Sequence, residues 1–203
     1  MRIDTHVHTS PGSRCSSMAK EAFLRESARH GLEAVCLTNH GNLADYDDIA
    51  SVATFALRVI PGVEISSPAG DFLIYSADLD FLRGLKAVQS LPGRMQRPEM
   101  TAVVWAHPFA GNGGGANAAE DYYARIAPQV DGIEVYNGNW PDDTASALAR
   151  RIADEFSLAE LGGSDAHRNE QLMRCWTEVE GEIDGVIDFV TAVLERGTAA
   201  KKK

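Results

Sequence analysis

The chain has 203 residues, of which 44% are hydrophobic and 24% are charged, and its formal net charge is -10. This length and composition suffice to bury the core of one domain. The acidic balance argues against a groove that follows the backbone of a long nucleic acid, whereas a small anionic substrate remains compatible. The only basic cluster is Lys201–Lys203. We expect one domain over residues 1–198 and a disordered basic tail over residues 199–203.

The sequence also predicts the compartment. No apolar run approaches the roughly 18 residues of a membrane-spanning helix, and acidic and histidine residues interrupt the first ten positions, where a signal peptide would be apolar. The three cysteines, Cys15, Cys36 and Cys175, form an odd and sparse set that does not suit a disulfide framework. We therefore expect a cytoplasmic protein with no membrane partner, and the sequence leaves the oligomeric state open.

Along the chain, short β-rich runs alternate with segments that have apolar residues every three to four positions. The first pattern predicts seven strands, at Arg2–Thr5, Ala34–Thr38, Arg58–Ile65, Phe72–Ser76, Ala102–Ala106, Gly132–Tyr136 and Ala159–Gly163. The second predicts helices at Met18–His30, Tyr46–Leu57, Phe81–Ser90, Glu120–Val130, Thr144–Phe156 and Asp184–Arg196. The alternation favours an α/β architecture.

Histidines and carboxylates follow many of these strands in five short motifs, and of the six histidines only His30, near the end of a predicted helix, lies outside them. The motifs are Asp4–His8, Thr38–His40, Gly62–Glu64, Ala106–Pro108 and Gly163–His167. Catalytic groups gather at the carboxyl ends of strands in α/β proteins. Closure into a barrel of roughly seven strands would bring the first and last motifs round one mouth.

The motifs contain the ligand types of a multinuclear metal site. Neutral imidazole and carboxylate together suit Zn²⁺, Mn²⁺ or Fe, and a carboxylate can bridge two ions. His6 and His8 are two residues apart, so on an extended segment their rings point to the same face. Asp165 and His167 repeat that spacing near the other end of the chain.

Two loops are predicted to border this mouth. Ser67–Gly70 has the Pro and Gly of a tight reversal, so we expect a hairpin that returns Asp71 close to Glu64 on an antiparallel strand. The segment Gly111–Ala118 is rich in Gly and Asn, and we expect it to act as a lid or substrate loop.

At these motifs the chain resembles the PHP family, the polymerase and histidinol phosphatase metal-dependent phosphoesterases. The motifs match in order over almost the whole chain. The resemblance implies a single-domain, distorted seven-stranded (β/α)7 barrel with two or three divalent ions, Mn, Fe or Zn, at its C-terminal mouth. It also implies three groups of ligands: His6, His8, Glu64 and Asp165 for the first ion, Glu64 and His107 for the second, and His40 and His167 with a partner from the first loop for the third.

The chain departs from the family pattern at three positions. Asn39 stands where many relatives have Asp, although His40 follows it as expected. Asp71 stands where many relatives carry a histidine, and because a carboxylate can replace imidazole we keep it as a candidate metal ligand. Cys15 lies in the loop where some relatives place an Asp ligand, and the sequence does not decide whether it binds metal.

Further residues are assigned supporting roles. Asp4 is expected to accept the spare N–H of a ligating histidine and so fix its tautomer. Arg14 and Arg168, in mouth loops, could clamp phosphate through their guanidinium groups. We expect Asn137 near the substrate and Glu134 to be structural. In catalysis, His40 or His167 would assist the departing oxygen if not fully coordinated.

These inferences predict a metal-dependent phosphomonoesterase that hydrolyses a small phosphate ester with a metal-activated water. Only 42 residues separate Glu64 from His107, which leaves no room for a large inserted domain, so specificity must come from loops. Three alternatives stay open: a phosphodiesterase or 3′–5′ exonuclease acting on nucleotides, a metal-binding module without catalysis, and hydrolysis of a C–N bond.

Overall fold

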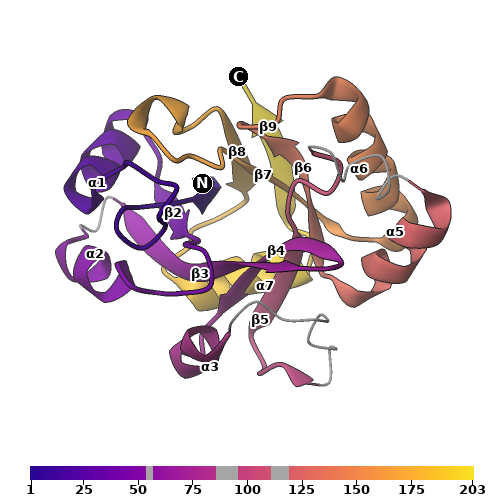
Figure 1. Ribbon diagram of the computed structural model, residues 1–203, viewed down its shortest axis with the longest axis horizontal. Coiled ribbons are helices and arrows are strands. Elements are labelled where there is room, and N and C mark those ends of the chain that lie inside the picture. The colour runs from indigo at the N-terminus through magenta and orange to yellow at the C-terminus, as the bar shows by residue number, and fades with distance from the viewer. Residues whose placement is uncertain (54–56, 86–95, 111–118) are drawn as a thin grey trace.

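The computed structural model describes residues 1–53, 57–85, 96–110 and 119–203 (Figure 1). Its strands are β1 (Arg2–Val7), β2 (Ala34–Leu37), β3 (Arg58–Ser67), β4 (Gly70–Ser76), β5 (Thr101–Trp105), β6 (Gly132–Asn137), β7 (Ala159–Gly163), β8 (Cys175–Val179) and β9 (Thr198–Lys202). Its α-helices are α1 (Lys20–Arg29), α2 (Tyr46–Val52), α3 (Leu79–Gly84), α5 (Glu120–Ile126), α6 (Asp143–Phe156) and α7 (Val186–Leu194). Single 3₁₀ turns occur at Ala127–Gln129 and Asn169–Gln171.

The nine described strands form one mixed sheet in the order β7-β6-β5-β4-β3-β2-β1-β8-β9. The strands β1, β2 and β3 are parallel, as are β5, β6 and β7, whereas β4 is antiparallel to both of its neighbours. Both β8 and β9 are added antiparallel beyond β1. The α/β class and the antiparallel β3–β4 hairpin are therefore confirmed.

The sheet curls until β7 meets β1 and β8, so the barrel is nearly closed. The hydroxyl of Thr5 donates to the carbonyl of Gly162 at 3.0 Å, and the N–H of Gly162 donates to Thr177 Oγ1 at 2.9 Å. A Cβ at Gly162 would lie 2.5 Å from the carbonyl oxygen of Trp176. Glycine is needed here because any side chain would push the two ends of the sheet apart.

The expected count of seven strands is wrong, because β8 and β9 extend the sheet. The tail over residues 199–203 was expected to be disordered, but β9 runs through Lys202 and pairs with β8 over its whole length. Its Thr-Ala-Ala-Lys-Lys sequence is a poor strand former by local preference. Two tertiary contacts stabilise the strand instead: its backbone pairs with the edge of β8, and the ammonium of Lys202 pairs with Asp143.

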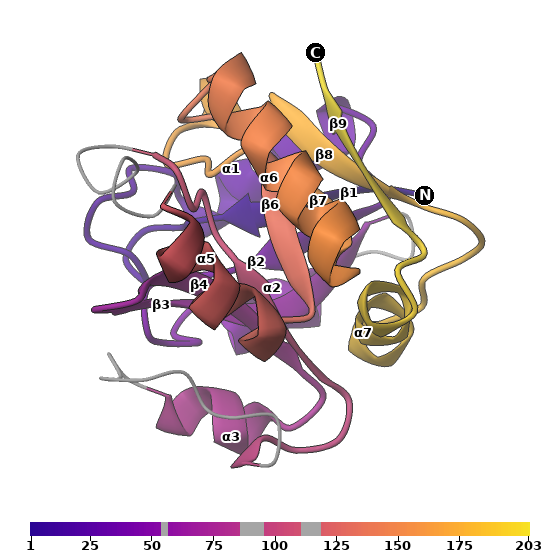
Figure 2. The same cartoon turned by 90° about the vertical axis from the view of Figure 1, so that its right-hand side faces the viewer.

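Helices cover the outside of the barrel and close one end. In Figures 1 and 2, α1 and α2 lie beside β1–β3, while α5 and α6 lie on the far side near β6 and β7. Helix α7 buries Phe189, Val190 and Val193 against residues at the starts of the parallel strands, including Ile3 and Ala34. The polar motifs lie at the opposite end of the barrel from α7.

Each predicted helix overlaps an α-helix of the structure, but α2 ends at Val52 and α3 at Gly84, before the predicted ends at Leu57 and Ser90. Parts of two predicted helices, 54–56 and 86–90, lie outside the described residues, as does the predicted lid loop 111–118. The helix expected over 120–130 is α5 followed by a 3₁₀ turn, and Pro128 lies in that turn. No described helix combines the length and the apolar character that a bilayer crossing requires.

Candidate metal centre

The five motifs meet at one end of the barrel. His6 lies within β1 and His8 directly after it, while Glu64 lies within β3. His107 follows β5 by two residues, and Asp165 follows β7 by two. His107 and Asp165 both have positive φ, 26° and 51°, which is uncommon for residues with a side chain and occurs most often where function demands it.

Four ligand atoms form a tight buried cluster. His6 Nε2 lies 3.4 Å from Glu64 Oε2 and 3.5 Å from Asp165 Oδ1. His8 Nε2 lies 3.2 Å and 3.3 Å from the same two oxygens. Metal bonds of about 2.0–2.1 Å in tetrahedral geometry separate neighbouring ligand atoms by about 3.4 Å. The spacing therefore fits a single ion among these four side chains.

Several polar atoms of this cluster lack a hydrogen-bond partner among the described residues. His6 Nε2, His8 Nε2 and Glu64 Oε2 are buried polar atoms without a hydrogen-bond partner among the described residues. A buried polar atom without a partner costs about 1–3 kcal/mol, and three such atoms meeting at one point need a common explanation. A bound cation supplies one, because it accepts the lone pairs of all of them at once.

A second group of ligands surrounds the other oxygen of Glu64. His107 Nε2 lies 3.1 Å from Glu64 Oε1, and Asp71 Oδ2 lies 4.0 Å from His107 Nδ1. Ligand atoms of Glu64, Asp71 and His107 all lie within 4.8 Å of one another. The hairpin thus returns Asp71 to the mouth, as the turn sequence predicts, and Glu64 has one oxygen toward each group.

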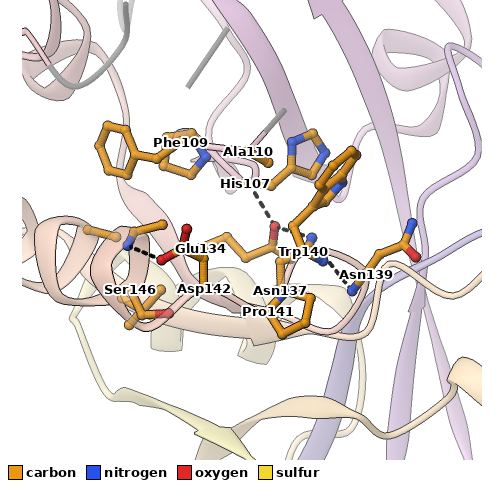
Figure 3. Close-up of a pocket in the computed structure, with 14 residues that line it drawn as sticks. His107, Phe109, Ala110, Glu134, Asn137, Asn139, Trp140, Pro141, Asp142 and Ser146 are labelled. Atoms are coloured by element: carbon orange, nitrogen blue, oxygen red, sulfur yellow. Dashed lines mark hydrogen bonds between the residues drawn. The ribbon is translucent and has the colours of Figure 1, made fainter. Parts of the chain in front are cut away.

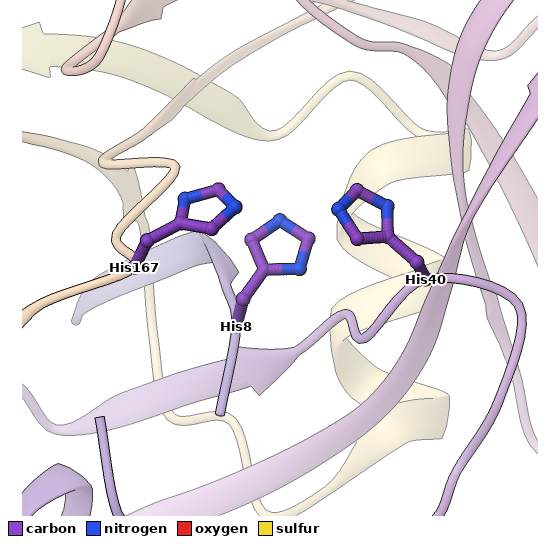
Figure 4. Close-up of side chains that lie close together, drawn as sticks. All are labelled: His8, His40 and His167. Atoms are coloured by element: carbon purple, nitrogen blue, oxygen red, sulfur yellow. The ribbon is translucent and has the colours of Figure 1, made fainter. Parts of the chain in front are cut away.

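A third group consists of three histidines (Figure 4). The ring of His8 lies between the other two, with centroids 4.5 Å from His40 and 4.4 Å from His167. Ligand atoms of the three lie within 4.8 Å of one another. Near this group, His40 Nδ1 is 3.0 Å from Glu64 Oε2, so the carboxylate of Glu64 contacts all three groups.

The electrostatics of the cluster are those of buried carboxylates held by imidazolium groups. Burial would raise the pKa of Glu64, but His6, His107 and His40 hold it well below its usual value. Burial likewise opposes ionisation of Asp165, yet His6 and His8 bring its pKa to about 2. Burial disfavours the charged form of His107, while Glu64 and Glu134 raise its pKa to about 9. Buried carboxylates at this density need a positive partner, which a bound cation would supply.

Glu134 organises this cluster from beneath, a role that the sequence interpretation missed. Its Oε1 lies 3.2 Å from His6 Nδ1, and its Oε2 accepts from the N–H of His107 and from Asn137 Nδ2, each at 2.8 Å. A Cβ at Gly163 would lie 2.7 Å from Glu134 Oε1 and 2.5 Å from His6 Cβ, so only glycine fits beside this pair. The sequence feature that could have indicated this role is a single acidic residue at an inward position of the otherwise apolar strand β6.

The expected hydrogen bond from a histidine ring to Asp4 is replaced by bonds from backbone N–H groups. Its carboxylate accepts three backbone N–H groups, those of Ser164 at 2.8 Å, Met173 at 3.1 Å and His6 at 3.4 Å, and no histidine ring. Burial raises its pKa to about 6. Asp4 therefore ties β1 to the loop after β7, and Glu134 holds the imidazole instead.

Asn39 has a structural reason to be an amide. Its Oδ1 accepts from Thr9 N at 2.8 Å and from Ser13 Oγ at 2.9 Å, while its Nδ2 donates to Thr9 Oγ1 at 3.0 Å. A carboxylate could not donate the last bond. Ser13 Oγ in turn lies 3.2 Å from His8 Nδ1 and accepts from His40 N at 3.1 Å, so Asn39 orients two histidines through one hydroxyl.

The remaining predicted residues lie at the rim. Arg14 and Arg168 are exposed. Cys15 is an exposed free cysteine; partial burial and the carboxylates of Glu64 and Asp165 raise its pKa. Asn137 is buried and bonded to Glu134. His30 is at the C-terminus of α1, away from the mouth.

A cavity of about 300 Å³ adjoins the cluster at His107 and Glu134 (Figure 3). It extends between the loop after β5, the loop after β6 and the first turns of α6. The residues that line it are His107, Pro108, Phe109, Ala110, Glu134, Val135, Asn137, Asn139, Trp140, Pro141, Asp142, Ala145, Ser146 and Ala149.

The fold and this cluster define a class of protein: a nearly closed α/β barrel whose mouth holds histidine and carboxylate groups that could bind metal ions. Residues 144–198 match the family model described as PHP-associated. Together with the five ordered motifs on this fold, this match over part of the chain bears out the resemblance to the PHP family stated above. A comparison with curated protein sequences finds no significant match.

Solved structures share the fold. PsfC from Pseudomonas syringae PB-5123 is similar with a TM-score of 0.74 at 20% identity, covering 100% of this chain and 91% of PsfC. A presumptive metal-dependent phosphoesterase from Bifidobacterium adolescentis has a TM-score of 0.65 at 16% identity, with 96% of each chain covered. The lesion-specific endonuclease PfuEndoQ from Pyrococcus furiosus has a TM-score of 0.68 at 16% identity, covering 99% of this chain and 57% of the endonuclease.

Proposed function

We propose that this domain is a metal-dependent phosphomonoesterase that hydrolyses small phosphate esters with two or three divalent ions, Mn, Fe or Zn. The observation that carries the proposal is the buried cluster of His6, His8, Glu64 and Asp165, whose ligand atoms have metal-ligand spacing and in part lack hydrogen bonds. The match of residues 144–198 to the PHP-associated family model and the fold shared with a presumptive phosphoesterase support the reaction class.

Three sets of residues would hold the ions. The first is the four-residue cluster, the second is Glu64, Asp71 and His107, and the third is His8, His40 and His167. When bound, such ions would polarise phosphoryl oxygens and lower the pKa of a coordinated water toward about 7.

The protein fixes the tautomers that this chemistry requires. Glu134 Oε1 can accept a hydrogen bond from His6 Nδ1–H, which leaves the Nε2 lone pair facing Glu64 and Asp165. His167 Nδ1 lies 2.9 Å from the carbonyl oxygen of Asp165, so it can donate there and leave Nε2 as the free nitrogen. Such partners reduce the cost of ordering a ligand before it binds.

Residues at the rim would handle the substrate. The side chain of His40 is 44% exposed while its Nδ1 contacts Glu64, so its other nitrogen could exchange a proton with a departing alkoxide. His167 is the second candidate for this role. The exposed Arg14 and Arg168 are proposed to clamp the non-reacting phosphate oxygens.

The test is phosphate release by protein reconstituted with Mn²⁺, across phosphomonoesters, nucleotides, bisphosphates and one diester. We expect release from at least one monoester by the wild type and none by His6→Ala. Metal-loaded wild type that is inactive on the whole panel would contradict the proposal and favour C–N hydrolysis or a module without catalysis.

A phosphodiesterase or nuclease is the second candidate, because the barrel shares its fold with the endonuclease PfuEndoQ. The net charge of -10 and the short basic segment at Lys201–Lys203 count against a long nucleic-acid substrate. Cleavage of the diester in the same panel, at a rate at least equal to that of the monoesters, would decide for this alternative.

A further inference from the structure

The cavity beside His107 has a composition that the phosphate-binding role does not explain. None of the described residues that line it is Lys or Arg, and its acidic members are Glu134 and Asp142. Its basic member is His107, a candidate metal ligand whose Nε2 lies 3.1 Å from Glu64 Oε1. We therefore place the phosphate beside His107 and the other candidate ligands, which leaves the rest of the cavity for another part of the substrate.

Two aromatic side chains, Phe109 and Trp140, line the cavity beside its polar residues. The Trp140 side chain is 48% exposed, the largest exposed aromatic among the described residues. Phe109 is half-buried and packs edge to face on Trp105 at 5.8 Å. In Figure 3, Trp140 and Phe109 lie at opposite sides of the view with His107 between them. An exposed tryptophan in a concave site is a surface for a flat ring.

Hydrogen bonds to Asn137 fix the backbone at Trp140. Asn137 Oδ1 accepts from the backbone N–H groups of Asn139 and Trp140, at 2.9 Å and 3.1 Å. Asn137 is bonded through its Nδ2 to Glu134, which also contacts His6. The aromatic wall and the metal ligands are therefore fixed to each other through one buried carboxylate.

We propose that this cavity binds the leaving group of the ester, and that this group is an uncharged alcohol with a planar apolar ring. The inference rests on the proposed function and names the substrate class of the same site. Ring stacking on Trp140 would contribute affinity, and the half-buried Ser146 and Asn139 offer polar groups for ring substituents. Lys202 and Lys203 line an adjoining cavity that shares Asn137, Pro141, Asp142 and Ser146 as walls, and Lys202 is paired with Asp143.

Two phosphonates that cannot be hydrolysed separate this proposal from the proposed function. Phenylphosphonate should bind Mn²⁺-loaded wild type about tenfold more tightly than methylphosphonate, measured by calorimetry. A charged ring should lose part of that gain, so 4-carboxyphenylphosphonate should bind more weakly than phenylphosphonate. Equal binding of the phenyl and methyl compounds would overturn the proposal.

Substitutions in the cavity test whether the phenyl ring of phenylphosphonate binds there. Trp140→Ala removes the wall and Ala145→Leu fills the cavity from α6, and each should reduce binding of phenylphosphonate about tenfold while leaving methylphosphonate unchanged. Trp176→Phe, at a tryptophan in β8 outside the cavity, is the matched control and should change neither. Weakening of both phosphonates by Trp140→Ala, or of neither, would refute a leaving-group site.

Turnover of two phosphate esters tests the cavity independently of phosphonate binding. In turnover, Trp140→Ala should raise KM for phenyl phosphate about tenfold without raising KM for methyl phosphate. If the wild type hydrolyses neither ester while phenylphosphonate still binds through Trp140, the proposed function fails and the aromatic site stands. If both esters are hydrolysed with equal KM by wild type and Trp140→Ala, the function stands and this inference fails.

Discussion

Glu134 Oε1 lies 3.2 Å from His6 Nδ1, and both side chains are fully buried. The same carboxylate accepts the N–H of His107, so one residue on β6 supports candidate ligands from β1 and from the loop after β5. A buried carboxylate with these partners sets both the tautomer and the orientation of the histidine.

Replacement of Glu134 should weaken metal binding without removing a ligand. In Glu134→Gln, one of the two acceptor atoms becomes an NH₂ group, which must face a donor from His6, His107 or Asn137. We expect metal affinity to fall about 10–100-fold, measured by titration with Zn²⁺ against a competing chelator. Glu160→Gln, at a carboxylate on β7 that pairs with Arg150, is the control. Unchanged affinity in Glu134→Gln would show that the contact with His6 has no role in metal binding.

Loss of a ligand should have a different signature. His6→Ala and Asp165→Asn should each abolish turnover and lower the number of bound metal equivalents, while the far-UV circular dichroism spectrum remains that of the wild type. His30→Ala, outside the mouth, is expected to be fully active. Full activity in either ligand variant would refute the assignment of the cluster.

Metal removal should cost stability as well as activity. The buried cluster has several ligand atoms without hydrogen bonds, so ions that bind only the folded state stabilise it. At a free metal concentration 100 times the Kd, the gain is about 2.7 kcal/mol. We expect the thermal midpoint to rise with Zn²⁺ or Mn²⁺ and to return to its starting value with chelator. A midpoint that does not respond would contradict a site in the folded barrel.

The three cysteines should react differently. Burial raises the pKa of Cys175 to about 12 and that of Cys36 well above its ordinary value, whereas Cys15 is exposed. In the folded protein we expect iodoacetamide to label Cys15 alone, read by mass spectrometry. Cys15 is absent from the ligand groups found among the described residues, so Cys15→Ser should bind as many metal equivalents as the wild type. Loss of one equivalent would make Cys15 a ligand.

The sequence could predict which histidines and carboxylates gather at the mouth, because part of that geometry is local. His6 and His8 share a face through the two-residue period of a strand, and the turn at Ser67–Gly70 returns Asp71 by hairpin geometry alone. Such patterns need no knowledge of distant contacts.

The errors concern contacts that depend on the whole fold. Asp4 and Glu134 are both buried acids on strands, and only the tertiary structure shows that the second faces an imidazole while the first faces backbone N–H groups. Strand β9 is likewise specified by the edge of β8 and not by its own residues. Local pattern carries no information on which partner a buried polar group finds.

The most direct test of the central claim is a crystal structure of protein grown with Mn²⁺ or Zn²⁺, with anomalous scattering measured at the metal edge. We expect an anomalous peak about 2.0–2.2 Å from His6 Nε2, His8 Nε2, Glu64 Oε2 and Asp165 Oδ1, with further peaks beside His107 or His40. A mouth without anomalous signal, in which water molecules bond the three unpaired atoms of His6, His8 and Glu64, would contradict it.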